Sequence, residues 1–362
     1  MRPRFCSTGL EVGSRRERIF SGSVHYWRLK RELWPGILDR VKELGFRMVE
    51  TYVPWQVHEI GPGMLDFGER DNCKDLDYFL SLCWEKSLYV MIRPGPHINA
   101  ELPYFGYPER IIMDPEIQAR TAWGTPCIMP YALKQFPVPS YASEKFYHEV
   151  GVYFDAVAPI LRKYLYPKGP LVAIQSDNET TYFFMLGPYV LDYSSDSIAL
   201  YRKFLLQKYG TLGRLNEAYR SEFTSVAEID PPTGFRGKRL HELPYYFDWA
   251  EYKEYQIIYA NKRITEMWVE RGIELPTFHN MAADDQYWQT PYDMARFEET
   301  GLIDVVGIDC YSTPDDYRGI SDRVKFMSAT SRLPFIPEFG SGAWYSHPRT
   351  FSPQEEEFSY LY

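Results

Sequence analysis

The sequence predicts an α/β fold, a (β/α)8 barrel of the TIM type that lacks its eighth strand in this chain. Short apolar runs typical of buried parallel strands alternate with longer amphipathic stretches, seven times along the 362 residues. Polar residues gather where these runs end, as they do at the catalytic face of a barrel. No glycine-rich phosphate motif follows the first run, which disfavours a doubly wound nucleotide-binding sheet.

The predicted strands are short runs of aliphatic, aromatic and β-branched residues between glycine, proline or polar residues. They span residues 18–26, 47–53, 88–93, 171–179, 276–280, 303–310 and 334–339. The fourth strand is the clearest, because its first four residues are all apolar and follow Gly169 and Pro170. It then turns polar and ends in Asp177, Asn178 and Glu179. This stretch therefore predicts a functional group at a strand end.

Helices are expected where apolar residues recur every three or four positions. They span residues 32–44, 76–82, 145–164, 197–209 and 252–271. In the first helix, Pro35 lies in the first turn, where proline fits, and Gly45 ends the helix. The last two helices lie in a long helical insertion, at about residues 180–275, between the fourth and fifth strands.

The C-terminal end of the sequence is short for a closed barrel. About twenty residues follow the seventh strand, and residues 355–362 resemble the start of a helix. We therefore expect residues 1–362 to form one catalytic barrel, C-terminally truncated or incomplete, with the insertion at about 180–275. An unusual open barrel is the alternative to truncation.

Composition disfavours several classes of function. The net charge of −9, without a basic stripe, argues against a nucleic-acid partner. The five cysteines are scattered and form no CxxC, so neither a disulfide framework nor a zinc site is suggested. No apolar run is long enough for a membrane span and no signal-peptide core is present, so no membrane partner is expected and the expected location is cytoplasmic. The aromatic share of 17% suits sugar binding, since rings with polar tips match both faces and hydroxyls of sugars.

Two predicted strands end in a glutamate. Glu179 ends the fourth strand and Glu338 ends the seventh. Because strand ends of a closed barrel face a common axis, the two carboxylates can flank one bound molecule. Retaining glycoside hydrolysis uses such a pair about 5–5.5 Å apart, one as nucleophile and one as general acid/base. Asn178 could then hydrogen-bond the sugar 2-hydroxyl.

These residues make the sequence resemble clan A glycoside hydrolases, in which Asn-Glu ends strand four and Glu ends strand seven. The first half is similar to glycoside hydrolase family 35 β-galactosidases. It shares FSGSVHY at 20–26, WP at 34–35, ETYVPW at 50–55, HE at 58–59, RPGP at 93–96 and AE at 100–101. The middle is similar to family 42 β-galactosidases. It shares AIQSDNE at 173–179, YG at 209–210, LNEA at 215–218 and FHN at 278–280.

The resemblance implies a retaining exo-β-glycosidase, and favours a β-galactosidase, with Glu338 as nucleophile and Glu179 as general acid/base. The implied sugar contacts are Tyr52, Glu101 and Asn178, and Tyr311 is implied to hydrogen-bond the nucleophile. The implied partner is a β-linked oligosaccharide or glycoside substrate, with no cofactor and no metal. Whether the chain forms a homo-oligomer is left open.

The sequence departs from the family patterns at three positions. His97 and Asn99 stand where family 35 usually has Tyr and Cys, and Thr180 follows Glu179 where an aromatic residue is common. These departures bear on the choice of sugar more than on the reaction type.

Two other functions remain as alternatives. A metal-dependent barrel hydrolase would use His25, His97, His279 and Asp309, which fall near predicted strand ends. The sequence has neither an HxH pair after the first strand nor an HExxH motif, which disfavours this reading. A non-catalytic carbohydrate-binding barrel is the other alternative, because an open barrel could hold the site too loosely for catalysis.

Overall fold

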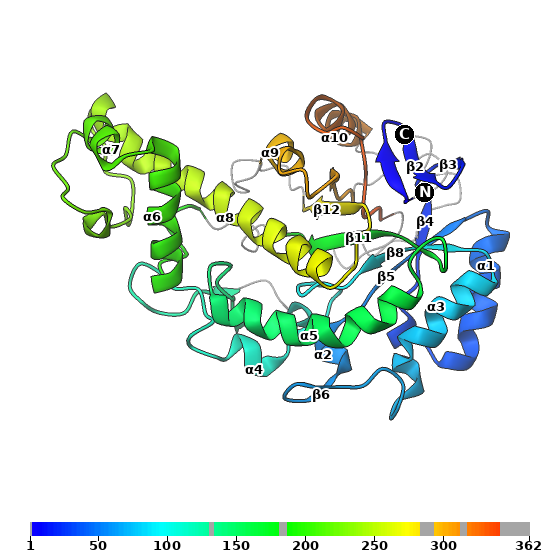
Figure 1. Ribbon diagram of the computed structural model, residues 1–362. Coiled ribbons are helices and arrows are strands. Elements are labelled where there is room, and N and C mark those ends of the chain that lie inside the picture. Colours follow the sequence, from blue (N-terminus) through cyan, green and yellow to red (C-terminus); the bar gives the residue numbers. More distant parts are fainter. Residues whose placement is uncertain (1, 130–133, 181–186, 283–292, 312–316, 341–362) are drawn as a thin grey trace.

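The computed structural model describes residues 2–129, 134–180, 187–282, 293–311 and 317–340. At its centre lies a six-stranded sheet in the order β13-β12-β11-β8-β5-β4, in which all neighbours are parallel (Figure 1). The strands are β4 (Ser21–Ser23), β5 (Met48–Tyr52), β8 (Tyr89–Arg93), β11 (Leu171–Asn178), β12 (Thr277–Met281) and β13 (Val305–Ile308). The described residues thus form a parallel half-barrel, which confirms the predicted class of an incomplete TIM-type barrel.

The segment predicted as the seventh strand is less regular than expected. Residues 334–339 run beside β13, where the Cys310 N–H donates to the Glu338 carbonyl at 2.8 Å. A Cβ at Gly307 would lie 2.3 Å from the backbone of this segment, so only glycine permits the approach. Pro337 has no N–H, which removes the donor that a continuous ladder needs at that point. The segment therefore forms no regular ladder: the Ile308 N–H of β13 donates to the Phe335 carbonyl at 3.2 Å, and Cys310, just after β13, forms an isolated bridge with Phe339.

Helices follow the strands and cover the outer face of the sheet (Figure 1). The helices of the described ranges are α1 (Trp34–Glu43), α2 (Trp55–His58), α3 (Leu76–Glu85), α4 (Glu109–Ile112), α5 (Glu144–Lys163), α6 (Ser195–Tyr209), α7 (Leu212–Tyr219), α8 (Leu243–Glu270), α9 (Met294–Glu299) and α10 (Tyr317–Thr330). Side-chain caps set several starts: Asp75 accepts from the N–H of Tyr78 in α3, and Ser143 from that of Phe146 in α5. None of the helices in the described ranges is long and apolar enough to cross a membrane.

Between β11 and β12, helices α6 and α7 and the first turns of α8 form a lobe that extends away from the sheet (Figure 1). Its own apolar cluster includes Tyr201, Leu205, Leu215, Trp249 and Tyr252. Helix α8 starts earlier than the expected residue 252, since the chain enters it through a 3-10 turn at residues 240–242 with a proline in the first helical turn. The lobe lies within residues 180–275, where helices were predicted.

A small sheet that the sequence analysis did not predict closes the amino end of the half-barrel. It consists of β1 (Arg4–Cys6), β2 (Gly9–Val12) and β3 (Arg15–Glu17). Its apolar residues pack against inward side chains near the start of the parallel strands: Phe5, Leu10 and Val12 against Met48, Met91, Val172, Ala173, Phe278, Val305, Leu333 and Phe335. Two short hairpins, β6 (Glu59–Gly61) with β7 (Met64–Leu65) and β9 (Ile128–Met129) with β10 (Phe136–Pro137), complete the strands of the described chain. The carboxyl ends of the parallel strands stay open for a site.

Candidate active site

A local irregularity at the end of β11 aims two polar residues into one cavity. The register of β11 against β12 shifts between Gln175 and Asn178, and such bulges re-aim side chains. Glu179 then takes a left-handed backbone with φ of 42°, and its N–H donates to Asn280 Oδ1 at 3.1 Å. Asn178 and Glu179 both line the cavity, whereas the Asp177 carboxylate accepts a backbone N–H from the loop after β8.

The cavity, of about 730 Å³, extends from the carboxyl ends of the parallel strands along the inside of the half-barrel to Thr8 and Gly9 at the amino-terminal sheet. All of the site residues predicted from the sequence line it: Tyr52, Glu101, Asn178, Glu179, Tyr311 and Glu338. The structure therefore brings these six side chains together, from segments far apart in the sequence. A volume of this size accommodates a small ligand such as a sugar.

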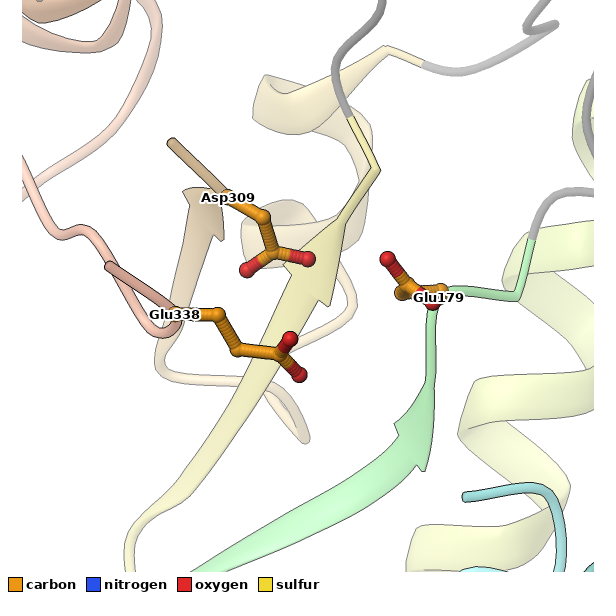
Figure 2. A group of neighbouring side chains, drawn as sticks. All are labelled: Glu179, Asp309 and Glu338. Atoms are coloured by element: carbon orange, nitrogen blue, oxygen red, sulfur yellow. The ribbon is translucent and has the colours of Figure 1, made fainter. Parts of the chain in front are cut away.

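Glu179 and Glu338 face each other across the cavity together with Asp309 (Figure 2). One carboxylate oxygen of each of the three residues lies within 4.8 Å of the others. Retaining glycosidases hold their two carboxyl groups about 5–5.5 Å apart, and inverting enzymes about 6.5–9.5 Å apart. One oxygen of Glu179 and one of Glu338 therefore lie closer together than the carboxyl groups of inverting enzymes.

Glu338 is surrounded by donors to its carboxylate. Its Oε1 accepts from Tyr52 Oη at 2.7 Å, from Asn280 Nδ2 at 3.0 Å and from the Arg93 guanidinium, and its Oε2 accepts from the Tyr311 hydroxyl. Burial acts to raise the pKa of Glu338, but Arg93 and the hydrogen bonds from Tyr311 and Tyr52 outweigh it and lower the pKa below its usual value. Glu338 is thus held as an anion whose position is fixed on both oxygens.

Glu179 has the opposite electrostatics. Burial, followed by repulsion from Glu338, raises its pKa to about 7. Its Oε2 accepts from Asn178 Nδ2 at 3.2 Å and from Asn99 Nδ2 at 3.4 Å. Two neighbouring carboxyls whose pKa values move apart are the signature of an acid/base pair: one is ionised while the other still carries its proton.

Two residues at the base of this site were not assigned a role from the sequence. Arg93 is 1% exposed and donates to Glu50 Oε1 at 3.1 Å, to Asn178 Oδ1 at 2.6 Å and to Glu338. Asn280 donates to Asn178 and Glu338 from its Nδ2. Both residues lie within the motifs that carry the family resemblance, near the carboxyl ends of β8 and β12, and that position was the signal available in the sequence.

Backbone strain is concentrated in the loop that carries Asn99 and Glu101. Asn99, Ala100 and Glu101 have consecutive φ values of 51°, 45° and 50°, which are unfavourable for residues other than glycine. The Arg28 guanidinium holds this loop by donating to the Ala100 carbonyl, and it lies 3.9 Å from the Glu101 carboxylate. The strained loop thus presents Asn99 to Glu179 and Glu101 to the cavity.

The residues considered for a metal site are not gathered into one donor set. In the described part of the chain, the metal-sized group of donors consists of Glu179, Asp309 and Glu338 and includes no histidine. His97 stacks against Phe105 and Tyr107, and His279 Nδ1 lies 3.1 Å from Ser176 Oγ. By distance the three carboxyls could hold a divalent cation. Glu338 is already ion-paired with the buried Arg93 guanidinium, and this positive charge disfavours a second cation at the same place.

Part of the chain matches a known protein family. Residues 10–125 match the family model of the glycosyl hydrolases family 35. The chain carries a glycosyl hydrolase family 35-like domain. This domain and the β-galactosidases among its structural neighbours confirm the predicted resemblance to clan A glycoside hydrolases of the family 35 and family 42 type.

Two relatives of this chain are both named exo-β-D-glucosaminidase. The protein of Thermococcus kodakarensis is 34% identical over 246 residues, which cover 66% of this chain and 30% of the relative. The protein of Pyrococcus horikoshii is 27% identical over 351 residues, which cover 95% of this chain and 40% of the relative. The chain therefore spans less than half the length of either relative.

One similar solved structure is the β-galactosidase from the psychrophilic Marinomonas ef1. It superposes with a TM-score of 0.71 at 17% identity, covering 94% of this chain and 51% of that chain. At this identity the similarity shows the fold alone, and it extends over 94% of this chain.

Proposed function

We propose that this chain is the catalytic barrel of a retaining exo-β-glycosidase, with β-galactosides as its preferred substrates and Glu338 and Glu179 as its catalytic pair. The observation that carries the proposal is the approach of these two carboxyls to within 4.8 Å, with the pKa of one lowered and that of the other raised. A barrel that only binds sugar has no need of such a pair. The exo mode follows the family resemblance.

In the first step, the ionised Glu338 attacks the anomeric carbon and the Glu179 proton passes to the departing glycosidic oxygen. The C1–O bond breaks as a bond from C1 to a Glu338 carboxylate oxygen forms. Tyr311 and Tyr52 hold the attacking carboxylate in place, and Arg93 keeps it ionised until the bond forms.

In the second step, Glu179 acts as a base. It takes a proton from a water molecule, whose oxygen attacks C1 while the bond from C1 to Glu338 breaks. Once Glu338 is esterified its negative charge is gone, so the repulsion that raised the pKa of Glu179 falls away. The same carboxyl can therefore serve as acid and then as base.

We further propose that residues 1–362 form one catalytic unit in which about 180–275 is an insertion. The small amino-terminal sheet and the segment at 334–339 share one apolar cluster with the parallel strands, which supports a single unit. Helices α6 and α7 build most of a separate apolar cluster, as expected of an insertion.

A panel of nitrophenyl glycosides tests the proposed function. We expect turnover of the β-galactoside, with the β-anomer as the first product seen by proton NMR, because two displacements restore the configuration. A first product with α configuration, or a well-folded protein that turns over none of the sugars, contradicts the proposal.

β-D-Glucosaminides are the second candidate substrates, because two archaeal relatives bear that name. The orientation of the Asn178 amide bears on the choice. Its Oδ1 accepts from Arg93 at 2.6 Å, from Asn280 at 3.1 Å and from Tyr52 at 3.2 Å. Because Arg93 can only donate, the amide cannot flip, and the N–H that does not donate to Glu179 remains for the ligand. An N–H donor suits a 2-hydroxyl and opposes a 2-ammonium group.

Replacement of this amide by a carboxylate is expected to change the preferred sugar. In Asn178→Asp, the ratio of kcat/KM for the β-galactoside over the β-glucosaminide should fall about 10- to 100-fold, the worth of one hydrogen bond to a charged group. Paired kinetics on the two nitrophenyl substrates measure the ratio. The control Asn178→Ala removes the donor without adding a charge, so its ratio should fall less than that of Asn178→Asp; an unchanged ratio in Asn178→Asp contradicts the assignment.

The opposite pKa shifts predict a bell-shaped pH profile. Since Glu179 must be protonated to donate, kcat/KM should fall about tenfold per pH unit above its pKa of about 7. Since Glu338 must be ionised and its pKa is lowered, the acid limb should lie below the usual value of 4.5. With a dinitrophenyl leaving group, which needs no protonation, the alkaline limb of kcat/KM should be absent from the parent and from Glu179→Gln. Retention of that limb would assign it to another residue.

A further inference from the structure

A third carboxyl, that of Asp309, lies beside the proposed catalytic pair, and neither reaction step uses it. Asp309 follows β13, its N–H donates to the Met281 carbonyl at 2.9 Å, and it is 3% exposed. Its side chain points toward Glu179 and Glu338 (Figure 2), with one oxygen of each of the three carboxyls within 4.8 Å of the others.

Among the described residues, only one carboxylate oxygen of Asp309 has a hydrogen-bond donor. Oδ2 accepts from Asn280 Nδ2 at 2.8 Å, whereas Oδ1 meets no N–H or O–H donor in the described ranges of the chain. The Glu179 carboxyl lies beside this side chain, with one oxygen of each group within 4.8 Å of the other. Two ionised carboxylates are both acceptors and cannot hydrogen-bond to each other. A hydrogen bond between these neighbouring carboxyls therefore requires a proton on one of the two groups.

The charges around Asp309 indicate which group keeps the proton. The groups that act on it are Glu338, Glu179, Arg93 and the Asn280 amide. Arg93 supplies the positive charge, but it is already ion-paired with both Glu50 and Glu338. Burial, then Glu338 and Glu179, raise the pKa of Asp309 well above its usual value, and Arg93 and Asn280 do not offset them. An ionised Asp309 would add a third negative charge around one buried cation.

We propose that Asp309 is a positioning residue that keeps its proton throughout the reaction and donates a hydrogen bond from it to Glu179. The inference rests on the proposed function. When Glu179 gives its proton to the departing oxygen it becomes an anion, and the Asp309 O–H hydrogen-bonds to that anion in the glycosyl-enzyme. When water is deprotonated, its proton goes to Glu179 and the Asp309 proton stays in place. Asp309 thus favours the ionised form that Glu179 needs as a base.

Two variants of the same size separate this role from packing and from charge. Asp309→Asn keeps a neutral donor, so we expect kcat within a few-fold of the parent and an unmoved pH profile. Asp309→Leu has no donor, so we expect kcat for a dinitrophenyl glycoside to fall about 10- to 100-fold. In the pH profile of kcat, the fall on the acid side reports the ionisation of Glu179 as the base of the second step. In Asp309→Leu this fall should move to higher pH, because the hydrogen bond that lowers the pKa of Glu179 is lost.

The sign of the shift in Asp309→Asn is the decisive readout. If Asp309 were ionised, the substitution would remove a negative charge beside Glu179, and the alkaline limb of kcat/KM would move to lower pH. That result, or an Asp309→Leu variant with the parent's profile, overturns the proposal. A parent without any turnover, by contrast, would count against the proposed function.

Infrared spectroscopy tests the proton without relying on turnover. Asp177, whose pKa burial raises to about 8, is first replaced in Asp177→Asn to remove its band. Because burial also raises the pKa of Glu50, the band of Asp309 is the one that persists above pH 8 and is absent from Asp309→Asn. Disappearance of all such bands by that pH contradicts a protonated Asp309.

Discussion

Glu338→Ala is expected to lower kcat/KM for a nitrophenyl β-galactoside by at least about 10⁴-fold, close to 5.5 kcal/mol of barrier. The reason is that no other described carboxylate has the same surroundings: Glu338 alone is both ion-paired with Arg93 and hydrogen-bonded by Tyr52 and Tyr311. Glu50, which shares Arg93, lies at the base of the site and cannot replace the attacking oxygen. Initial rates of the variant and the parent measure the loss.

Azide distinguishes loss of the nucleophile from loss of structure. In Glu338→Ala it should restore turnover by bonding to C1 as the aryl group leaves, giving the α-glycosyl azide after a single inversion. Glu270→Ala is the matched control, because Glu270 is exposed at the end of α8, away from the cavity, and should keep the parent's rate. A full parental rate in Glu338→Ala would show that Glu338 is not the nucleophile.

Glu179→Ala is expected to have an effect that depends on the leaving group. For alkyl or disaccharide substrates, which need protonation of the departing oxygen, kcat/KM should fall about 10²- to 10⁴-fold. For dinitrophenyl glycosides the first step needs no acid, so kcat/KM should change little, whereas kcat should fall because Glu179 is also the base of the second step. Steady-state kinetics over a series of leaving groups measure both.

Azide should again rescue Glu179→Ala, but with the opposite stereochemistry. It attacks the glycosyl-enzyme from the water side and gives the β-glycosyl azide. The two variants therefore serve as controls for each other, since one should form the α product and the other the β product. An equal loss for all leaving groups in Glu179→Ala would rule out Glu179 as the acid.

The parts of the fold that sequence patterns predict are those buried on both faces. Strands β5, β8 and β11 were placed to within a residue or two because the helices and the inner core leave them no exposed side, which produces continuous apolar runs. The amino-terminal sheet escaped prediction because its strands pair antiparallel and expose charged residues; Arg15 and Arg16 in β3 read as polar surface. Residues 334–339 were predicted as a strand, but Pro334 and Pro337 have no N–H to donate to a continuous ladder.

The position of the carboxyls could be predicted from strand ends, but their protonation could not. Because the carboxyl ends of the strands of a barrel meet at one face, the sequence predicts that Glu179 and Glu338 line one cavity, and the family resemblance predicts the tyrosines around them. The pKa shifts depend on burial, on separations below 5 Å and on how many carboxylates share Arg93, none of which a linear pattern contains. Asp309 was for the same reason considered only as a metal ligand.

The small amino-terminal sheet has a consequence for how the protein is made. The ring centroid of Phe5 lies 6.3 Å from that of Phe335, so the amino-terminal sheet packs against a segment more than three hundred residues later in the chain. At ribosomal speeds of about 5–20 residues per second, the first strands wait on the order of half a minute for this partner. During synthesis the amino-terminal strands must therefore remain soluble with an apolar face uncovered. Packing of the amino-terminal sheet against Phe335 is a late folding event.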